Sequence, residues 1–432
     1  MKKSVATNNS EQKGDTSKLF NEKDNFDSFK TKGSDSARNS SEFRHAQKLK
    51  ISDSKKSALI SAISIISGTA IGAGILGLPY VISKVGLVWG ILEIIILGLL
   101  MLLINLYVGE ISVRTKGDHQ LTGYAKIYLG EKGKKIMLIS MIFSLYAALI
   151  AYILAEGELL SYVFFGSVKY SFLASLGFWF IMLILITCSI KTMGKGENIG
   201  IIAILLLVGL IAIFFLPQSR PENFILSSGN NFLFNLFFPY GLILFALTSF
   251  SALPLVEQRL HGKERLMKKA IIISAIIPII VYLLFTISII GFKGTNVPEI
   301  GVIGLGKIPA LFGVFTIFTA FFSLAYALKS MYEFDFKIDK INAWLLTIII
   351  PLIMFWIISY LKLTSFVKIL GISGSITIAL IGIMILLMNK KAKMKGNRKP
   401  EYSIRINWFI IILLGALFIL GAIFEIYFNI FK

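Results

Sequence analysis

A break in the first hydrophobic segment constrains the fold of this chain more than any other feature. The run SGTAIGAGILGLP at residues 67–79 carries four glycines and ends in a proline, with apolar residues on both sides. Backbone that departs from a helix at membrane depth is tolerated only where it is buried in protein or lines a cavity. Such a break exposes amides of one half-helix and carbonyls of the other, which can hold a charged solute. The run therefore predicts a solute site inside a membrane, as in a transporter.

The composition is that of a polytopic membrane protein. Hydrophobic residues make up 56% of the 432 residues, and eleven apolar segments reach the ~20 residues that a helix needs to cross a bilayer. The predicted spans are 58–84, 87–112, 136–165, 172–190, 199–217, 232–256, 270–292, 308–330, 342–361, 364–388 and 406–429. We expect an all-α membrane domain over 58–432, preceded by a separate tail over 1–57.

The tail at residues 1–57 is rich in Ser, Asn, Lys and Asp and poor in aliphatic residues. This composition buries too little apolar surface to offset the entropy of ordering, so we expect the tail to be disordered. It contains no apolar h-region, so no cleavable signal peptide is indicated. We expect either a solvated extension or a regulatory segment.

The net charge of +20 follows the predicted topology and does not indicate a nucleic-acid partner. If the tail is cytoplasmic, 36 of the 44 Lys and Arg residues fall on its side of the membrane, as the positive-inside rule requires. The basic run from Lys390 to Lys399 suits an anionic leaflet. We therefore expect a multi-pass protein of the plasma membrane, in contact with lipid, with a cytoplasmic N-terminus and an outside C-terminus.

Residues that would carry metal, redox or hydrolytic chemistry are scarce. The single cysteine is Cys188, in the fourth predicted span, and His45, His119 and His261 fall in the tail or in predicted inner loops. None matches a zinc or haem spacing, and we expect the histidines to be solvated. No cluster of acids and histidines at membrane depth suggests catalysis. We expect no enzyme, no catalytic residue and no cofactor.

A second interrupted segment lies five spans after the first. Residues 237–254, FFPYGLILFALTSFSALP, place small polar residues at mid-membrane depth and a proline a few residues later. Spans one and six enter the membrane from opposite sides, so the pair indicates an inverted repeat with its site at the midplane. We expect repeat one at 58–217, repeat two at 232–388 and an extra helix at 406–429. The alternative for segment six is an ordinary helix with a proline kink.

Three motifs resemble those of the amino acid/auxin permeases and of the hydroxy and aromatic amino acid permeases, within the amino acid–polyamine–organocation superfamily. The first-helix motif is GTAIGAGILGLP at 68–79; the supporting motifs are 245–257 in the sixth helix, and 319–322, 327–329 and 335–336 around the eighth. The likeness covers roughly 58–388. It implies the fold of the bacterial leucine transporter, in which two five-helix repeats interlock and helices one and six are unwound at the centre.

An amino acid is a zwitterion, so its carrier must offer donors to a carboxylate and acceptors to an ammonium group. The amides of Ala73, Gly74 and Ile75 would open the outer half of helix one and face the carboxylate. Carbonyls released around 67–70 and 245–248 would accept from the ammonium group. By analogy with the superfamily, the Tyr152 hydroxyl contacts the carboxylate; its alternative role is a packed aromatic. The predicted substrate-binding set is Thr69, Gly72, Ala73, Gly74, Ile75, Tyr152, Phe245, Thr248 and Ser249.

Thr248 and Ser249 also have an ordinary alternative, which is hydrogen bonding back to the preceding helical turn.

Coupling to a cation is expected, with the ion left open between Na⁺ and H⁺. The resemblance to sodium-dependent relatives implies a site of oxygen atoms from Gly68, Ile71, Thr316 and Thr319. Ala320 stands where those relatives have a second hydroxyl, which weakens the sodium case. Segment 199–217 carries no lysine that could replace the ion.

Carboxylates within spans are functional hypotheses by default. Glu93, Glu156 and Glu158 lie in the outer halves of predicted spans, and Glu158 is the candidate gate or proton carrier. The alternative for each is a carboxylate that reaches an aqueous vestibule or pairs with a lysine. Glu425, near the end of the last span, is expected at the membrane interface.

These observations favour a secondary active carrier of neutral or aromatic amino acids that works by alternating access. The main alternative is a non-transporting amino acid sensor that signals through the tail. Deletion of residues 1–50 separates the two, because a carrier would keep uptake whereas a sensor would bind its ligand without moving it.

Overall fold

The computed structural model describes residues 55–187, 193–224 and 232–431, and these residues contain helices and no strand. Residues 1–54 of the predicted tail and Cys188 lie outside the described residues. The first described helix already includes residues 55–57, which the sequence assigned to the tail. The tail's boundary and the two repeats stay predictions.

The described elements follow one another with short connections. They are the helix Lys55–Ala70, η1 Ala73–Gly77, α3 Leu78–Val85, α4 Leu87–Arg114, α5 Leu121–Phe165, η2 Val168–Tyr170, α6 Ser171–Thr187, α7 Met193–Phe215, η3 Leu216–Gln218, η4 Pro221–Phe224, α8 Phe232–Phe237, α9 Tyr240–Ala246, η5 Phe250–Ala252, α10 Leu253–Arg259, η6 Glu264–Leu266, α11 Met267–Lys293, α12 Lys307–Phe334, α13 Lys340–Leu361, α14 Phe366–Ser373, η7 Gly374–Ile378, α15 Ala379–Lys395 and α16 Trp408–Phe431.

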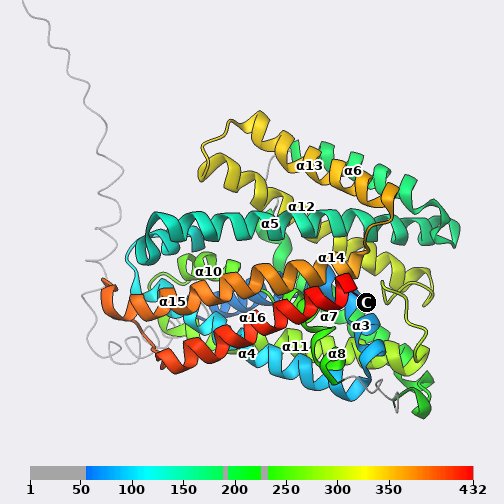
Figure 1. Ribbon diagram of the computed structural model, residues 1–432, viewed down its shortest axis with the longest axis horizontal. Helices are drawn as coiled ribbons and strands as arrows, with labels where there is room; N and C mark the ends of the chain where they lie inside the picture. Colours follow the sequence, from blue (N-terminus) through cyan, green and yellow to red (C-terminus); the bar gives the residue numbers. More distant parts are fainter. Residues whose placement is uncertain (1–54, 188–192, 225–231, 432) are drawn as a thin grey trace, which may run out of the picture. The chain divides into compact units, whose positions relative to one another are not determined.

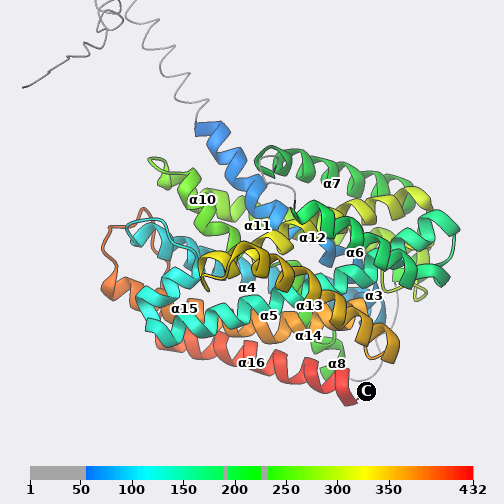
Figure 2. The same cartoon turned by 90° about the horizontal axis from the view of Figure 1, so that it is seen from above.

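Within the described ranges, ten helical spans are long and apolar enough to cross a membrane, and the bent pair Lys55–Ala70 and Ala73–Val85 gives an eleventh. This confirms the predicted all-α polytopic membrane protein. Figures 1 and 2 show the long helices, among them α4, α5, α15 and α16, running lengthwise beside one another.

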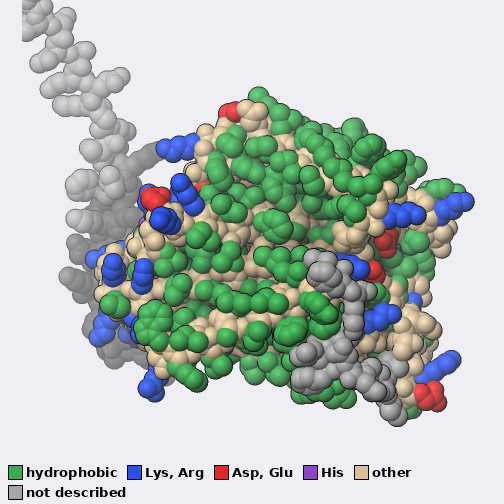
Figure 3. Space-filling view, viewed as in Figure 1, with side chains coloured by type: hydrophobic (Ala, Val, Ile, Leu, Met, Phe, Trp, Pro, Cys, Tyr) green, Lys and Arg blue, Asp and Glu red, His purple; other side chains and the backbone are tan. Residues whose placement is uncertain are grey.

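Apolar side chains cover the outside of the bundle as well as its core. Ile213 of α7, Trp356 of α13 and Phe409 of α16 are all more than half exposed. Figure 3 shows hydrophobic side chains over the middle of the visible face, and lysines and arginines toward its two ends. Such a surface suits lipid around the middle and water at the ends.

The third span differs from its prediction at its start. It begins at Leu121, whereas the sequence placed residues 113–135 in a loop, and Gly130 breaks it with a φ of 80°. The segment before Gly130 is an amphipathic helix, because Leu121, Tyr124, Ala125 and Tyr128 form one buried stripe at helical spacing. Mean hydropathy does not detect this segment as a helix, because its other face is polar.

A buried carboxylate organises one end of the bundle. Glu110 of α4 is fully buried and accepts hydrogen bonds from Arg114 Nε at 2.8 Å, Ser403 Oγ at 2.9 Å and the Ile404 amide at 2.9 Å. Lys393 Nζ of α15 lies 3.3 Å from the same carboxylate. We call the region formed by the ends of α4, α10 and α15 and their adjoining loops the basic end. It corresponds to the predicted cytoplasmic side.

The centre of the bundle depends on close helix contact. A Cβ on Gly241 of α9 would overlap the carbonyl oxygen of Gly371 in α14, and one on Gly374 would overlap the carbonyl of Gly241. Glycine is therefore required where α9 crosses α14 and η7. The short helix η1 packs against α9, α12 and α14. The two interrupted spans thus lie against each other in the core.

Candidate functional site

The first predicted interruption is present. The helix that starts at Lys55 ends at Ala70, and a bend of 45° separates it from Ala73–Val85. Gly72 is the N-cap of η1, with extended backbone angles. Ala73 and Gly74 take the first two positions of η1, where no carbonyl of the same helix can accept from their amides. The break therefore supplies backbone donors, as the sequence predicted.

The second interruption is also present, so the proline-kinked helix considered for segment six is wrong. Helix α9 ends at Ala246, and regular helix resumes only at η5 and at α10, which begins at Leu253. Pro239 is the N-cap of α9, and Pro254 takes an early position in α10. Prolines at these positions remove no intrahelical hydrogen bond, because the first amides of a helix have no partner.

The two breaks touch at Gly74 and Ala246. A Cβ on Gly74 would lie 2.9 Å from the Cβ of Ala246 and 3.0 Å from its Cα. No side chain fits that gap, so Gly74 permits the approach that the sequence expected of it.

A tyrosine that the sequence did not single out joins the two breaks. The hydroxyl of Tyr282, on α11, lies 2.7 Å from the carbonyl oxygen of Ala70 and 2.7 Å from that of Ala246. Its side chain is fully buried. The single phenolic proton serves two carbonyls, each at the end of a helical stretch. Of the carbonyls expected to accept from an ammonium group, those of Ala70 and Ala246 are therefore occupied.

A pocket with a volume of about 120 Å³ lies beside the breaks. Its lining combines apolar and neutral polar residues and includes no charged one: Thr69, Ala70, Gly72, Gly74, Met141, Ser144, Leu145, Ala148, Tyr152, Phe245, Ala246, Thr248, Phe250, Ser251, Leu324, Ile378 and Ile381. Thr69 and Ser251 are exposed, so the pocket is open beside them. Met141, Ser144 and Leu324 lie on the parts of α5 and α12 nearer the basic end. The pocket therefore opens toward that end.

Tyr152 of α5 lies at the first break, as the resemblance implied. Its hydroxyl lies beside the Ala73 amide and would lie 3.7 Å from a Cβ on Gly72. Tyr152 is 3% exposed and also lines the pocket.

Six of the nine expected substrate-binding residues line the pocket: Thr69, Gly72, Gly74, Tyr152, Phe245 and Thr248. Ala73 and Ile75 are fully buried, so only their backbone could serve the site. The expectation that Ser249 lines the pocket is wrong: its hydroxyl accepts a hydrogen bond from Asn105 Nδ2 of α4 at 2.9 Å. Ser251 lines the pocket in its place. The change of register comes from the non-helical residues 247–249, because helical periodicity does not carry through them.

The two threonine hydroxyls in the pocket bond back to their own helices. Thr69 Oγ1 donates to the Ile65 carbonyl at 2.8 Å, and Thr248 Oγ1 donates to the Leu244 carbonyl at 2.8 Å. This is the ordinary alternative considered for Thr248. Once its proton is donated, each hydroxyl oxygen keeps lone pairs that can accept.

No hydrogen bond of the described chain joins the predicted cation ligands of the first span, Gly68 and Ile71, to those of α12, Thr316 and Thr319. Thr319 is exposed and donates its hydroxyl to the carbonyls of Phe315 at 3.0 Å and Thr316 at 3.1 Å. Thr316 is buried, and its hydroxyl has no partner among the described residues. A Cβ on Gly68 would meet nothing within 4 Å, whereas Ile71 is 1% exposed. The cation set stays a prediction.

The acids of the outer half-spans differ in their surroundings. Glu158 is partly buried and interacts electrostatically with Glu299 in the loop after α11. Glu93 is 6% exposed and Glu156 is 1% exposed. Glu425, which the sequence placed at the membrane interface, is only 2% exposed. Helix α16 turns that side chain into the bundle, against α9 and α14.

The end of the bundle opposite the basic end is closed over η1. The Gly301 amide donates to the Leu76 carbonyl at 2.8 Å. Val297, Ile300 and Val302 of the same loop are buried in the core. The loop between α11 and α12 therefore covers the outer half of the first span.

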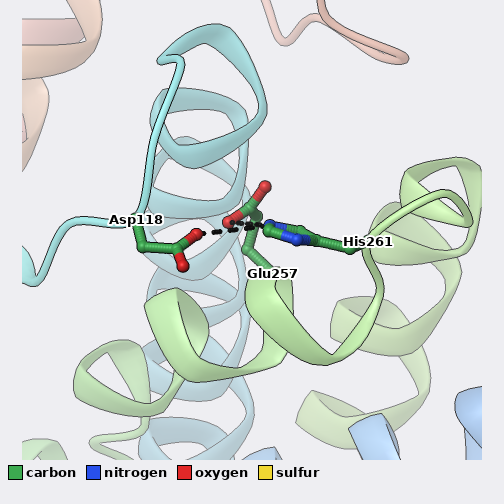
Figure 4. Close-up of side chains that lie close together, drawn as sticks. All are labelled: Asp118, Glu257 and His261. Carbon is green, nitrogen blue, oxygen red and sulfur yellow. Dashed lines mark ion pairs between the residues drawn. The ribbon is translucent and has the colours of Figure 1, made fainter. Parts of the chain in front are cut away.

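One histidine expected to be solvated is part of a cluster at the basic end (Figure 4). His261 Nε2 lies 3.3 Å from Asp118 Oδ1 and 3.6 Å from Glu257 Oε2. The three side chains offer ligand atoms within 4.8 Å of one another, a donor set that suits a divalent cation such as Zn²⁺. His261 and Asp118 are more than half exposed. The cluster connects the end of α10 to the loop between α4 and α5.

Comparison with known proteins adds to this geometry. The sequence model of the tryptophan/tyrosine permease family matches residues 55–304, more than half of the chain. The chain is 24% identical over 367 residues to Glutamine transporter 2 of Aliivibrio fischeri, covering 81% of this chain and 92% of that protein. It is 26% identical over 252 residues to Tyrosine-specific transport system 2 of Haemophilus influenzae, covering 54% of this chain and 58% of that protein. It is 24% identical over 255 residues to a tryptophan-specific transport protein of Pseudomonas aeruginosa, covering 56% and 60%.

Proposed function

Because the chain belongs to the tryptophan/tyrosine permease family, we propose that it is a secondary active transporter of neutral or aromatic amino acids. The observation that carries the proposal is the pocket at the meeting point of two interrupted spans. Both interruptions contribute to it, through Gly72 and Gly74 on one side and Phe245 and Thr248 on the other. A site at the meeting of two broken helices is the arrangement in which transporters hold a small charged solute.

The carboxylate of the substrate is bound at the first break. The amides of Ala73 and Gly74 begin η1, and the Tyr152 hydroxyl lies beside the Ala73 amide. A carboxylate placed there receives backbone donors at a helix start and the phenolic proton of Tyr152. The site needs no arginine or lysine, and none lines the pocket.

The ammonium group is bound by hydroxyl oxygens. Tyr282 already occupies the carbonyls of Ala70 and Ala246. Thr69 and Thr248 donate their protons to their own helices, so their oxygens present lone pairs to the pocket. These two hydroxyls accept from the ammonium group, one from each interrupted span.

The side chain of the substrate occupies the apolar part of the pocket, formed by residues such as Met141, Leu145, Phe245, Leu324 and Ile378. A charged side chain would find no partner there and would lose its hydration. The pocket therefore favours neutral substrates. Tryptophan, tyrosine and glutamine, the substrates in the names of the three relatives, are the first to test.

Transport proceeds by alternating access between the two ends. This conformation is open toward the basic end, which we place on the cytoplasmic side of the plasma membrane. Uphill transport is driven by a cation, Na⁺ or H⁺. This cycle assumes the inverted-repeat fold of the amino acid–polyamine–organocation superfamily.

The experiment is counterflow in proteoliposomes that contain the full chain. Vesicles are loaded with one unlabelled amino acid, and entry of the labelled form is followed for each standard amino acid in turn. We expect saturable exchange of one or a few neutral amino acids. Binding without exchange would indicate a sensor, and neither binding nor exchange for any of them would contradict the proposal.

A further inference from the structure

Glu93 of α4 is a buried acid that the substrate pocket does not use. It is 6% exposed, and neither of its carboxylate oxygens has a hydrogen-bond partner in the part of the chain that the structure describes. An ionised carboxylate without a partner in such surroundings would lose its hydration without compensation. Glu93 is therefore compatible with this conformation as the neutral, protonated acid.

Glu425 of α16 approaches the same place from the last helix. Its Oε2 accepts the Gly241 amide at 3.4 Å. A Cβ on Gly371 would lie 2.5 Å from its Oε1, and a Cβ on Gly241 would lie 3.1 Å from its Cδ. Two glycines, one on α9 and one on α14, thus form a notch that a side chain would fill. The carboxyl group of Glu425 occupies it.

Helix α9, which carries Tyr240, packs against both α4 and α16, and Tyr240 and the two acids interact electrostatically across this contact. Helix α16 packs tightly beside them, because a Cβ on Gly421, one turn before Glu425, would overlap the Tyr240 ring. Two carboxylates that interact in buried surroundings cannot both be ionised at low cost. Protonation of one of them removes the repulsion.

The other charged or titratable groups around the pair come from three elements. The small pocket that Glu425 lines also contains Tyr80 of α3, Glu299 of the loop after α11 and Lys368 of α14. Lys368 is exposed, so water screens it. Tyr240 is the described titratable group that interacts electrostatically with both acids.

We propose that Glu93 and Glu425 form a proton-binding site that holds α4 and α16 against the first half of the interrupted sixth span, and that this proton is released during transport. The inference rests on the proposed function, because it assigns the site a step in that cycle. One O–H bond of a carboxylic acid breaks, and its proton passes to water. The resulting negative charge then favours separation of α9 from α4 and α16, which admits water to the pair.

The first test reads the proton directly and needs no transport. Infrared difference spectra of the full chain in lipid compare wild type with Glu93→Gln. We expect wild type to show the carbonyl band of a buried protonated carboxylic acid that the variant lacks and that disappears at alkaline pH. Identical spectra would overturn the proposal. Glutamine mimics the neutral acid in shape, so the variant should fold.

The second test measures coupling in proteoliposomes with labelled tryptophan, tyrosine and glutamine. Glu93→Gln and Glu425→Gln should retain counterflow, while accumulation driven by an imposed pH gradient falls to the level reached without a gradient. Glu222→Gln, which removes an exposed carboxylate elsewhere, should keep both activities. Retention of gradient-driven accumulation by both pair variants would overturn the proposal, as would its loss in Glu158→Gln alone.

The two proposals fail in different ways. If wild type shows no counterflow, the proposed function is contradicted, and the infrared band still decides whether the proton site exists. If wild type exchanges amino acids but the band is absent, only the proton site is contradicted.

Discussion

Ala70 and Ala246 direct their carbonyl oxygens at one phenol, although 176 residues separate them in the chain. Each oxygen lies 2.7 Å from the hydroxyl of Tyr282, and each residue ends the helical stretch that precedes a break. One hydroxyl proton therefore links both interrupted spans to α11. Neither break holds its position through its own hydrogen bonds alone.

Tyr282→Phe should weaken both the fold and transport. The substitution removes the hydroxyl proton from both carbonyls; Ala70 keeps the Gly72 amide as a donor at 2.8 Å, whereas the Ala246 carbonyl loses its bond to Tyr282, at a cost of about 1–3 kcal/mol. We expect a lower melting temperature in detergent and a slower maximal rate of exchange. A variant with wild-type stability and exchange would show that the carbonyls find other donors.

Gly74→Val should abolish substrate binding and leave the bundle folded. The new side chain would collide with Ala246, whose Cβ lies 2.9 Å from the position of the added Cβ, and the breaks would be forced apart. Gly177→Val, on an exposed face of α6, is the matched control, because its Cβ meets nothing within 4 Å. Binding is measured by isothermal titration with the substrate found in counterflow. Equal affinity in the two variants would contradict the proposed site.

Tyr152→Phe should raise the KM for exchange roughly 10- to 100-fold, since a hydrogen bond to a charged group contributes about 1.5–3 kcal/mol. The ring stays, so packing against the neighbouring helices is retained. Tyr162→Phe, nearly three turns further along α5, makes the same chemical change away from the pocket and should leave KM unaltered. If both variants behave like wild type, the phenol of Tyr152 serves packing alone.

Thr248→Val and Ser249→Ala should differ although the residues are adjacent. Thr248 lines the pocket, so its loss should reduce affinity for the ammonium group by about tenfold. Ser249 accepts from Asn105 away from the pocket, so its loss should lower the melting temperature and leave KM near the wild-type value. The opposite pattern would mean that the register around the second break differs from that described.

The sequence alone was sufficient to predict a polytopic membrane protein and the two interrupted spans. Glycine and proline inside an apolar segment act locally, so the breaks near Gly74 and Ala246 could be predicted without knowing any neighbour. The helix Leu121–Leu129 was missed because hydropathy does not detect a segment with one polar face. Its buried stripe, with Tyr124 and Tyr128, was the signal available.

The side chains around the breaks depend on tertiary contacts that a single sequence does not reveal. Ser249 was placed in the pocket because helical periodicity was continued through residues that are not helical. Tyr282 has no local signature, since one tyrosine in an apolar span can face any neighbour. Glu425 was assigned to the interface because its distance from the chain end says nothing about which helices cover it.

The hydrogen bond from the Gly301 amide to the Leu76 carbonyl holds the loop between α11 and α12 over the outer half of the first span. Both atoms belong to the peptide backbone, so exposed side chains of the loop do not form this bond. A side chain at position 301 would crowd it, because a Cβ there would lie 3.2 Å from the Leu76 carbonyl oxygen. The opening rate on that face should therefore change with insertions, deletions and substitutions of Gly301, whereas substitutions of exposed loop residues leave it unaltered.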